Sequence, residues 1–141
     1  MTRTTSGRTT MTREDYERYA AAFNARDYDA VYDFYAPGAR LAFFGVDLPD
    51  RAAFKRFYAF LHSYVDESLT IERFAASDEL VALEGVIRIE ARRDLTAQAL
   101  AAEGLDRFFP IRAGEVQELR QSIHYHVANG RFTGVTCALM E

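Results

Sequence analysis

A few polar side chains of this chain could polarise an oxygen atom or carry a proton. Tyr19 lies on the apolar face of a helix-periodic segment, where its hydroxyl could donate a hydrogen bond into a pocket. Asp47, His62 and His124 are the candidate proton carriers, because carboxylates and imidazoles are common general acids and bases. These four residues form the predicted catalytic set.

Each candidate also has a structural interpretation. Tyr19 could be a core tyrosine whose hydroxyl finds a polar partner. Asp47 precedes Leu48-Pro49 and fits either a pocket rim or a solvated turn. His62 fits the C-terminal end of a helix, where a positive charge is favourable. His124 and His126 alternate with an apolar strand face, which predicts that both lie on the outer face of a sheet; a register slip of one residue would reverse this.

Aromatic and weakly polar side chains are expected to bind the substrate. A buried polar group on the inward strand face needs a partner, either a neighbour or a ligand. The predicted substrate-binding residues are Tyr16, Phe23, Tyr35, Phe57, Gln121, Tyr125, Cys137 and Phe108.

The elements that must position these groups follow from periodicity. Thr12 can cap a helix whose apolar face recurs at i, i+3, i+4 and i+7 through Phe23. Residues 24–27 interrupt it, and a second short helix is expected to run to Tyr35. The remaining predictions are a helix capped by Asp50, a short helix from Asp94 through Ala102, and strands over 40–46, 69–74, 80–91, 115–127 and 131–140.

Three helices followed by antiparallel strands predict an α+β fold, with the helices packed on one face of a curved sheet. A strongly curved sheet leaves a cavity between itself and the helices. We expect one domain over residues 13–141 after a polar tail at 1–12.

Composition excludes several classes of protein. With 49% hydrophobic residues the chain is not disordered, and it has no apolar run of about 20 residues that would cross a membrane. The net charge of −4 argues against a nucleic-acid partner. No Cys/His cluster has metal-ligand spacing, so no metal is expected, and no cofactor is expected either. A single cysteine fits a reducing cytoplasm.

Three segments, RYAAAFNARDYD, DAVYDFYAPGARL and YHVANGRFTGVTC, resemble the nuclear transport factor 2-like superfamily. It includes ketosteroid isomerase, scytalone dehydratase and the SnoaL-like polyketide cyclases. The resemblance implies a cone-shaped α+β fold around one apolar pocket, and a homodimer. The pattern RY-x-x-A-x-N-x-x-D implies that Tyr19 is the oxyanion donor.

The acids of these relatives are missing from the matching positions. The carboxylate base of the isomerase falls on Phe43, and its second, protonated acid falls on Ile123. The cyclase aspartate falls near Cys137, and Gln121 stands near an asparagine of the dehydratase. We therefore expect a cofactor-free acid–base enzyme of dehydratase, isomerase, cyclase or retro-aldol lyase type, acting on a small hydrophobic, aromatic or polyketide-like molecule. The alternative is a binding or assembly module.

Residues 92–113 exceed the family pattern and could form a lid or an oligomer contact.

Overall fold

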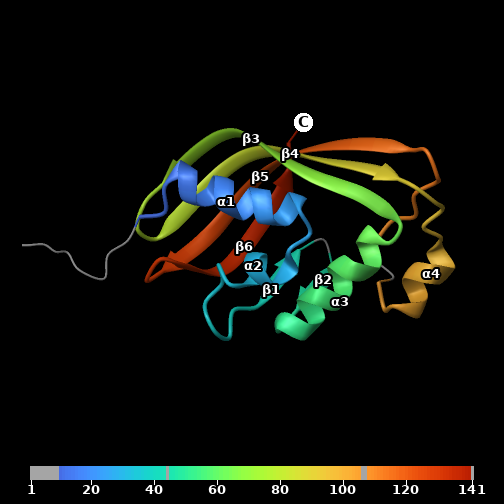
Figure 1. Ribbon diagram of the computed structural model, residues 1–141, viewed down its shortest axis with the longest axis horizontal. Coiled ribbons are helices and arrows are strands. Elements are labelled where there is room, and N and C mark those ends of the chain that lie inside the picture. The colour runs from blue at the N-terminus through green and yellow to red at the C-terminus, as the bar shows by residue number, and fades with distance from the viewer. Residues whose placement is uncertain (1–9, 44, 106–107, 141) are drawn as a thin grey trace, which may run out of the picture.

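The computed structural model describes residues 10–43, 45–105 and 108–140 (Figure 1). The helices are α1 (Arg13–Asn24), α2 (Tyr28–Tyr32), α3 (Arg51–His62) and α4 (Ala97–Ala102). The strands are β1 (Leu41–Phe43), β2 (Val46–Leu48), β3 (Val65–Ala76), β4 (Leu80–Ala91), β5 (Val116–Ala128) and β6 (Arg131–Leu139).

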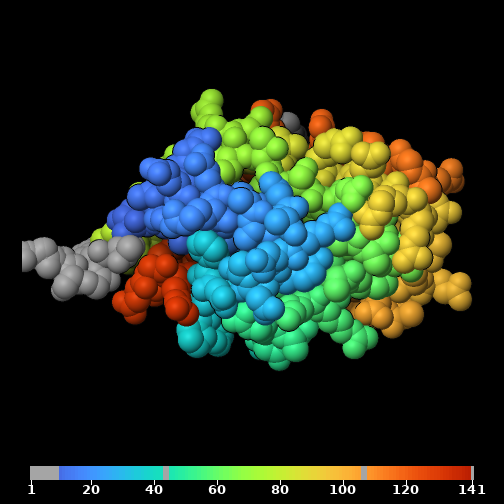
Figure 2. Space-filling view, viewed as in Figure 1, coloured from blue at the N-terminus to red at the C-terminus, as the bar shows by residue number. Residues whose placement is uncertain are grey.

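The four long strands form one antiparallel sheet in the order β3-β4-β5-β6, and β1 and β2 pair separately as a hairpin. Alternate residues of β4, from Val81 to Ile89, are buried, as the sequence pattern predicts. In Figure 1 α1 lies across the sheet with α2 and α3 beside it, and Figure 2 shows these three helices covering one side of the molecule. The α+β prediction is therefore confirmed.

The helices begin at the polar residues that satisfy their first N–H groups. Thr12 and Asp15 form a reciprocal capping box on α1, and Asp50 accepts a hydrogen bond from the N–H of Ala53 in α3. The cap of α4 differs from the prediction: Thr96 accepts from Ala99, whereas Asp94 accepts from the N–H of Ala113 at 2.8 Å.

The sheet bends where β3 and β4 approach each other closely. The pairing of β3 with β4 shifts by one residue between Ile71 and Arg73, a β-bulge opposite Gly85. A Cβ atom on Gly85 would lie 2.9 Å from the carbonyl oxygen of Thr70, so only glycine fits there without a shift. The bulge and the glycine together let the strands curve.

Two strands differ from their predicted bounds. The predicted strand 40–46 is instead part of the β1–β2 hairpin, which turns through Gly45 at φ 81°. β3 begins at Val65 rather than Leu69, because residues 65–68 pair with residues 88–91 of β4.

Within the predicted extension, residues 92–105 and 108–113 pack against each other. Leu95 and Ile111 exchange two backbone hydrogen bonds of 2.8 and 3.0 Å, and both side chains are buried together with Leu100 of α4. None of the helices in the described part of the chain is long and apolar enough to cross a membrane.

Candidate functional site

A cavity of about 510 Å³ lies between the helices and the inward face of the sheet. Its wall is mainly aromatic and aliphatic, which is the usual character of a small-molecule site. The structure places eight of the predicted residues in this wall: Tyr19, Phe23, Tyr35, Phe57, Phe108, Gln121, Tyr125 and Cys137.

Tyrosine hydroxyls pair with one another at the buried end of the wall. The hydroxyl oxygens of Tyr19 and Tyr35 are 2.9 Å apart, and those of Tyr16 and Tyr125 are 2.7 Å apart. Tyr16 is not among the described wall residues; it supports Tyr125. Burial raises the pKa of Tyr19 to about 12, so its hydroxyl keeps its proton at neutral pH.

Because each paired hydroxyl has one proton, only one proton of a pair is used in the mutual hydrogen bond. The other can be donated to a ligand oxygen. The Tyr19–Tyr35 pair, both of whose members line the cavity, is therefore a hydrogen-bond donor facing an apolar space.

Two further polar groups of the wall are buried without a partner among the described residues. The hydroxyl of Tyr58 and the side-chain amide of Gln121 make no hydrogen bond there, although Tyr58 is only 9% and Gln121 only 4% exposed. Burial, and then the neighbouring Glu67 carboxylate, raises the pKa of Tyr58 well above its ordinary value. An unsatisfied buried polar group costs about 1–3 kcal/mol, which a ligand oxygen could recover.

Glu67 is the only carboxylic acid among the described wall residues. Its Oε1 lies 2.8 Å from Nε2 of His62, and the two side chains are 10% and 2% exposed. His62 ends α3, and Glu67 follows Val65 on the inward face of β3, so the turn between the helix and the strand brings the pair together. His62 therefore does not cap its helix through its ring, which was the structural alternative for this residue.

Glu67 was not among the predicted site residues, because the predicted strand 69–74 begins two residues after it. The signal was present: Val65, Glu67 and Leu69 alternate, so an earlier strand start would have placed Glu67 on the inward face. The contact between Glu67 and His62 could not be predicted from the sequence, because it depends on the angle between α3 and β3.

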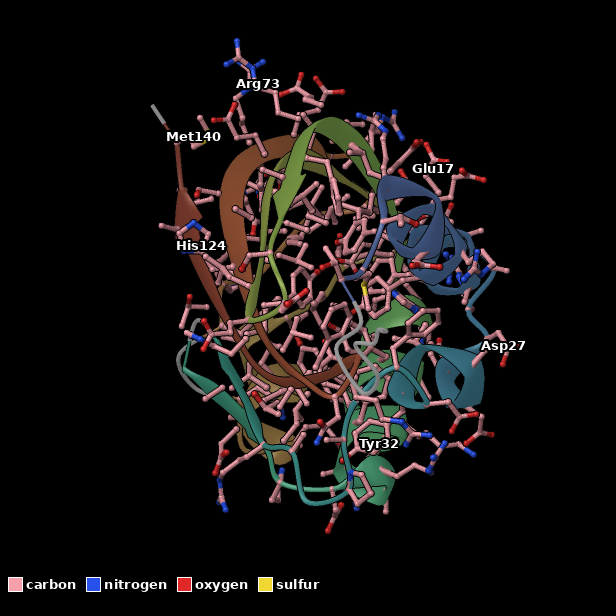
Figure 3. All side chains as sticks on the ribbon, turned by 90° about the vertical axis from the view of Figure 1, so that its left-hand side faces the viewer. Glu17, Asp27, Tyr32, Arg73, His124 and Met140 are labelled. Carbon is pink, nitrogen blue, oxygen red and sulfur yellow. The ribbon has the colours of Figure 1, made fainter. Side chains whose placement is uncertain are left out.

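The structure places the other two proton-carrier candidates outside the cavity. Asp47 is on the β1–β2 hairpin and forms hydrogen bonds of 3.0 and 2.9 Å with Arg40, whose guanidinium lowers the pKa of Asp47. His124 is exposed on the outer face of β5 and points away from the interior (Figure 3), and His126 is exposed beside it. Strand parity thus gave the correct face for both histidines.

Aromatic side chains from the extension line the cavity next to α3. The rings of Phe108 and Phe109 stack with centroids 5.3 Å apart, and Phe108 meets Phe57 edge-on at 6.2 Å. Phe109 and Leu139 also line the cavity while 43% and 58% exposed, so the cavity has an apolar rim. Within the described residues no cluster of His, Cys, Asp and Glu could hold a metal ion.

The family model of the SnoaL-like domain matches residues 16–135, and the chain belongs to this family. No curated protein matches the sequence.

Solved structures share the fold of the nuclear transport factor 2-like superfamily. A candidate polyketide cyclase from Silicibacter sp. is 20% identical, with a TM-score of 0.70 over 89% of this chain and 85% of its own. A second one, from Xanthomonas campestris, is 25% identical, with a TM-score of 0.67 over 86% and 84%. TerC, co-crystallised with polyporic acid, is 14% identical, with a TM-score of 0.65 over 90% and 89%.

Proposed function

We propose that this protein is a cofactor-free acid–base enzyme in which Glu67, held by His62, transfers a proton to or from a small hydrophobic molecule in the cavity. The observation that carries the proposal is the position of one carboxylate, with a histidine behind it, in an otherwise apolar wall. A carboxylate shielded from water by apolar walls is a base suited to proton abstraction from carbon.

The tyrosine hydroxyls supply the complementary half of the chemistry. Tyr58 and the Tyr19–Tyr35 pair keep their protons at neutral pH and can donate to the oxygen on which negative charge develops. Gln121 can orient a second polar group of the substrate. Proton removal beside a carbonyl, with the enolate oxygen held by these donors, is a step common to dehydratases, isomerases, cyclases and retro-aldol lyases.

The aromatic wall favours an aromatic or polyketide-like substrate, and TerC, which has a similar fold, was co-crystallised with polyporic acid. At protein-like packing density, a cavity of about 510 Å³ has room for about 380 Å³ of ligand van der Waals volume, the size of a molecule with three or four rings.

Nitrobenzisoxazole tests the base directly. Removal of its ring C–H proton breaks the N–O bond and releases a coloured cyanonitrophenolate, so the absorbance reports proton abstraction alone. We expect the wild-type protein to accelerate the reaction over buffer, and Glu67→Gln to lower the rate at least tenfold, about 1.4 kcal/mol. Glu72→Gln, on the exposed face of the same strand, is the matched control. A wild-type rate equal to that of buffer, or equal rates in the wild type and Glu67→Gln, would contradict the proposal.

A second candidate is a module that binds the same molecules without converting them. The polar side-chain groups of Tyr58 and Gln121, which have no hydrogen-bond partner among the described residues, favour it, because a bound ligand would satisfy them whether or not a proton moves. We also propose a homodimer formed through the outer sheet face that carries Arg88, Arg120 and His124. Sedimentation of the wild type and of an outer-face charge reversal, Arg88→Glu, tests this: a wild-type monomer would exclude it.

A further inference from the structure

The buried carboxylate of Glu67 has one oxygen atom without a hydrogen-bond partner among the described residues. Its Oε1 lies 2.8 Å from Nε2 of His62, and the side chain makes no other hydrogen bond or ion pair there. The side chain is only 10% exposed and lines the cavity. The second oxygen, Oε2, is therefore an acceptor that an occupant of the cavity can satisfy.

His62 needs no positive charge to hold this carboxylate. The hydroxyl oxygen of Tyr28 lies 2.8 Å from Nδ1 of His62, while Nε2 contacts Glu67. In a neutral ring with its proton on Nε2, Nδ1 accepts from the Tyr28 hydroxyl and Nε2–H donates to Glu67. Both ring nitrogens then have a partner, and the pair of Glu67 and His62 carries one negative charge.

The described surroundings of the pair supply no cation to match this charge. The described wall residues include no lysine, arginine or histidine. Arg26 and Arg92 both donate to the backbone carbonyl of His62, and both pair with Asp66 rather than with Glu67. Their side chains are 36% and 40% exposed, so solvent screens their charges. Because a buried charge without an oppositely charged partner is costly, the cavity favours a positively charged ligand.

Aromatic rings next to the carboxylate are the second feature that suits a cation. The ring centroids of Phe23 and Tyr58 lie 6.1 and 5.5 Å from that of His62, and both residues line the cavity. The two rings meet edge-on, with centroids 5.6 Å apart. A positively charged nitrogen within about 6 Å of a ring centroid is attracted by the negative face of the ring.

We propose that the cavity recognises a hydrophobic molecule with a positively charged nitrogen, which lies against Oε2 of Glu67 and the rings of Phe23 and Tyr58. The inference rests on the proposed function in placing the ligand against Glu67, but recognition of the charge does not require a proton to move. The apolar remainder of the wall contacts the hydrophobic body of the ligand. The charge also assists the proposed proton transfer, because a positive charge beside the reacting carbon stabilises the negative charge that develops there.

Two probes of the same shape test the charge alone. Trimethyl(2-naphthylmethyl)ammonium carries a permanent positive charge and has no N–H group, and 2-neopentylnaphthalene has a carbon atom in place of the nitrogen. Equilibrium dialysis against the full-length protein, followed by naphthalene fluorescence, gives the Kd of each probe. We expect the wild type to bind the ammonium ion about tenfold or more tightly than the hydrocarbon.

Matched variants assign this preference to one carboxylate. In Glu67→Gln, which keeps an oxygen for His62, the ratio of the hydrocarbon Kd to the ammonium Kd should fall by about tenfold or more. In Glu72→Gln, on the exposed face of the same strand, the ratio should stay at the wild-type value. Circular dichroism verifies that both variants are folded. Tighter binding of the hydrocarbon by the wild type, or the same ratio in the wild type and Glu67→Gln, would overturn the inference.

Salt and catalysis give two further outcomes. Loss of the preference at about 1 M salt would overturn the inference, because salt screens exposed carboxylates but not one enclosed by the cavity wall. Nitrobenzisoxazole cleavage that depends on Glu67, together with an unchanged Kd ratio in Glu67→Gln, would overturn the inference and leave the proposed function standing. A Kd ratio that falls in Glu67→Gln, without cleavage by the wild type, would support the inference and overturn the proposed function.

Discussion

Truncation of Glu67 should destabilise the protein through the partner that it leaves behind. In Glu67→Ala the Nε2–H of His62, a side chain only 2% exposed, loses its acceptor without gaining water. A lost hydrogen bond to a charged group corresponds to about 1.5–3 kcal/mol of unfolding free energy. Glu67→Gln keeps an acceptor oxygen at the same place, so we expect it to cost less than about 1 kcal/mol.

Urea unfolding followed by circular dichroism measures the difference. With a slope of about 2 kcal/mol per molar urea, Glu67→Ala should lower the midpoint by about 1 M and Glu67→Gln by less than about 0.5 M. Glu72→Ala breaks an exposed ion pair with Arg120 and should shift it by less than about 0.5 M. Equal midpoints for Glu67→Ala and the wild type would refute the claim that His62 holds the carboxylate in the cavity wall.

Two further predictions concern Tyr19 and Cys137, which both line the cavity. The pKa of Tyr19 is about 12 in the folded protein and about 10 when unfolded. Its contribution to stability is therefore complete below about pH 10 and is lost as the pH rises through about 12, and near pH 11 the loss is roughly 1 kcal/mol. Urea unfolding at about pH 8 and 11 should show a weaker pH dependence of stability in Tyr19→Phe than in the wild type. Partial burial raises the pKa of the Cys137 thiol to about 11, so a disulfide reagent at neutral pH should modify the folded protein more slowly than the urea-unfolded protein. Equal rates would contradict its half-buried position in the cavity wall.

Much of the fold could be predicted from the sequence because its signals are local. The spacing of Tyr16, Tyr19 and Phe23 sets the buried face of α1, and the alternation over 81–89 sets that of β4. The β1–β2 hairpin could not be predicted with equal security, because Gly45 is a single turn residue inside an apolar run. There the length of the run suggested one strand.

The candidate site was predictable only in part. Side chains on periodic elements, such as Tyr19 and Tyr125, could be placed in the wall from parity alone. The contact between His62 and Glu67 depends instead on how a helix end meets a strand start, which no spacing rule encodes. Asp47 illustrates the converse: its place after an expected strand suggested the pocket rim, and the hairpin pairs it with Arg40 instead.

The central claim, that Glu67 changes a bound molecule by moving a proton, is tested most directly with small molecules extracted from the organism that makes the protein. The extract is incubated in deuterated buffer with the wild type, with Glu67→Gln and with Glu72→Gln, and compared by mass spectrometry. We predict that at least one hydrophobic molecule gains deuterium, loses water or is cleaved with the wild type and with Glu72→Gln, but not with Glu67→Gln. Molecules that bind to the wild-type protein and are recovered with unchanged mass would contradict the claim and identify a binding module.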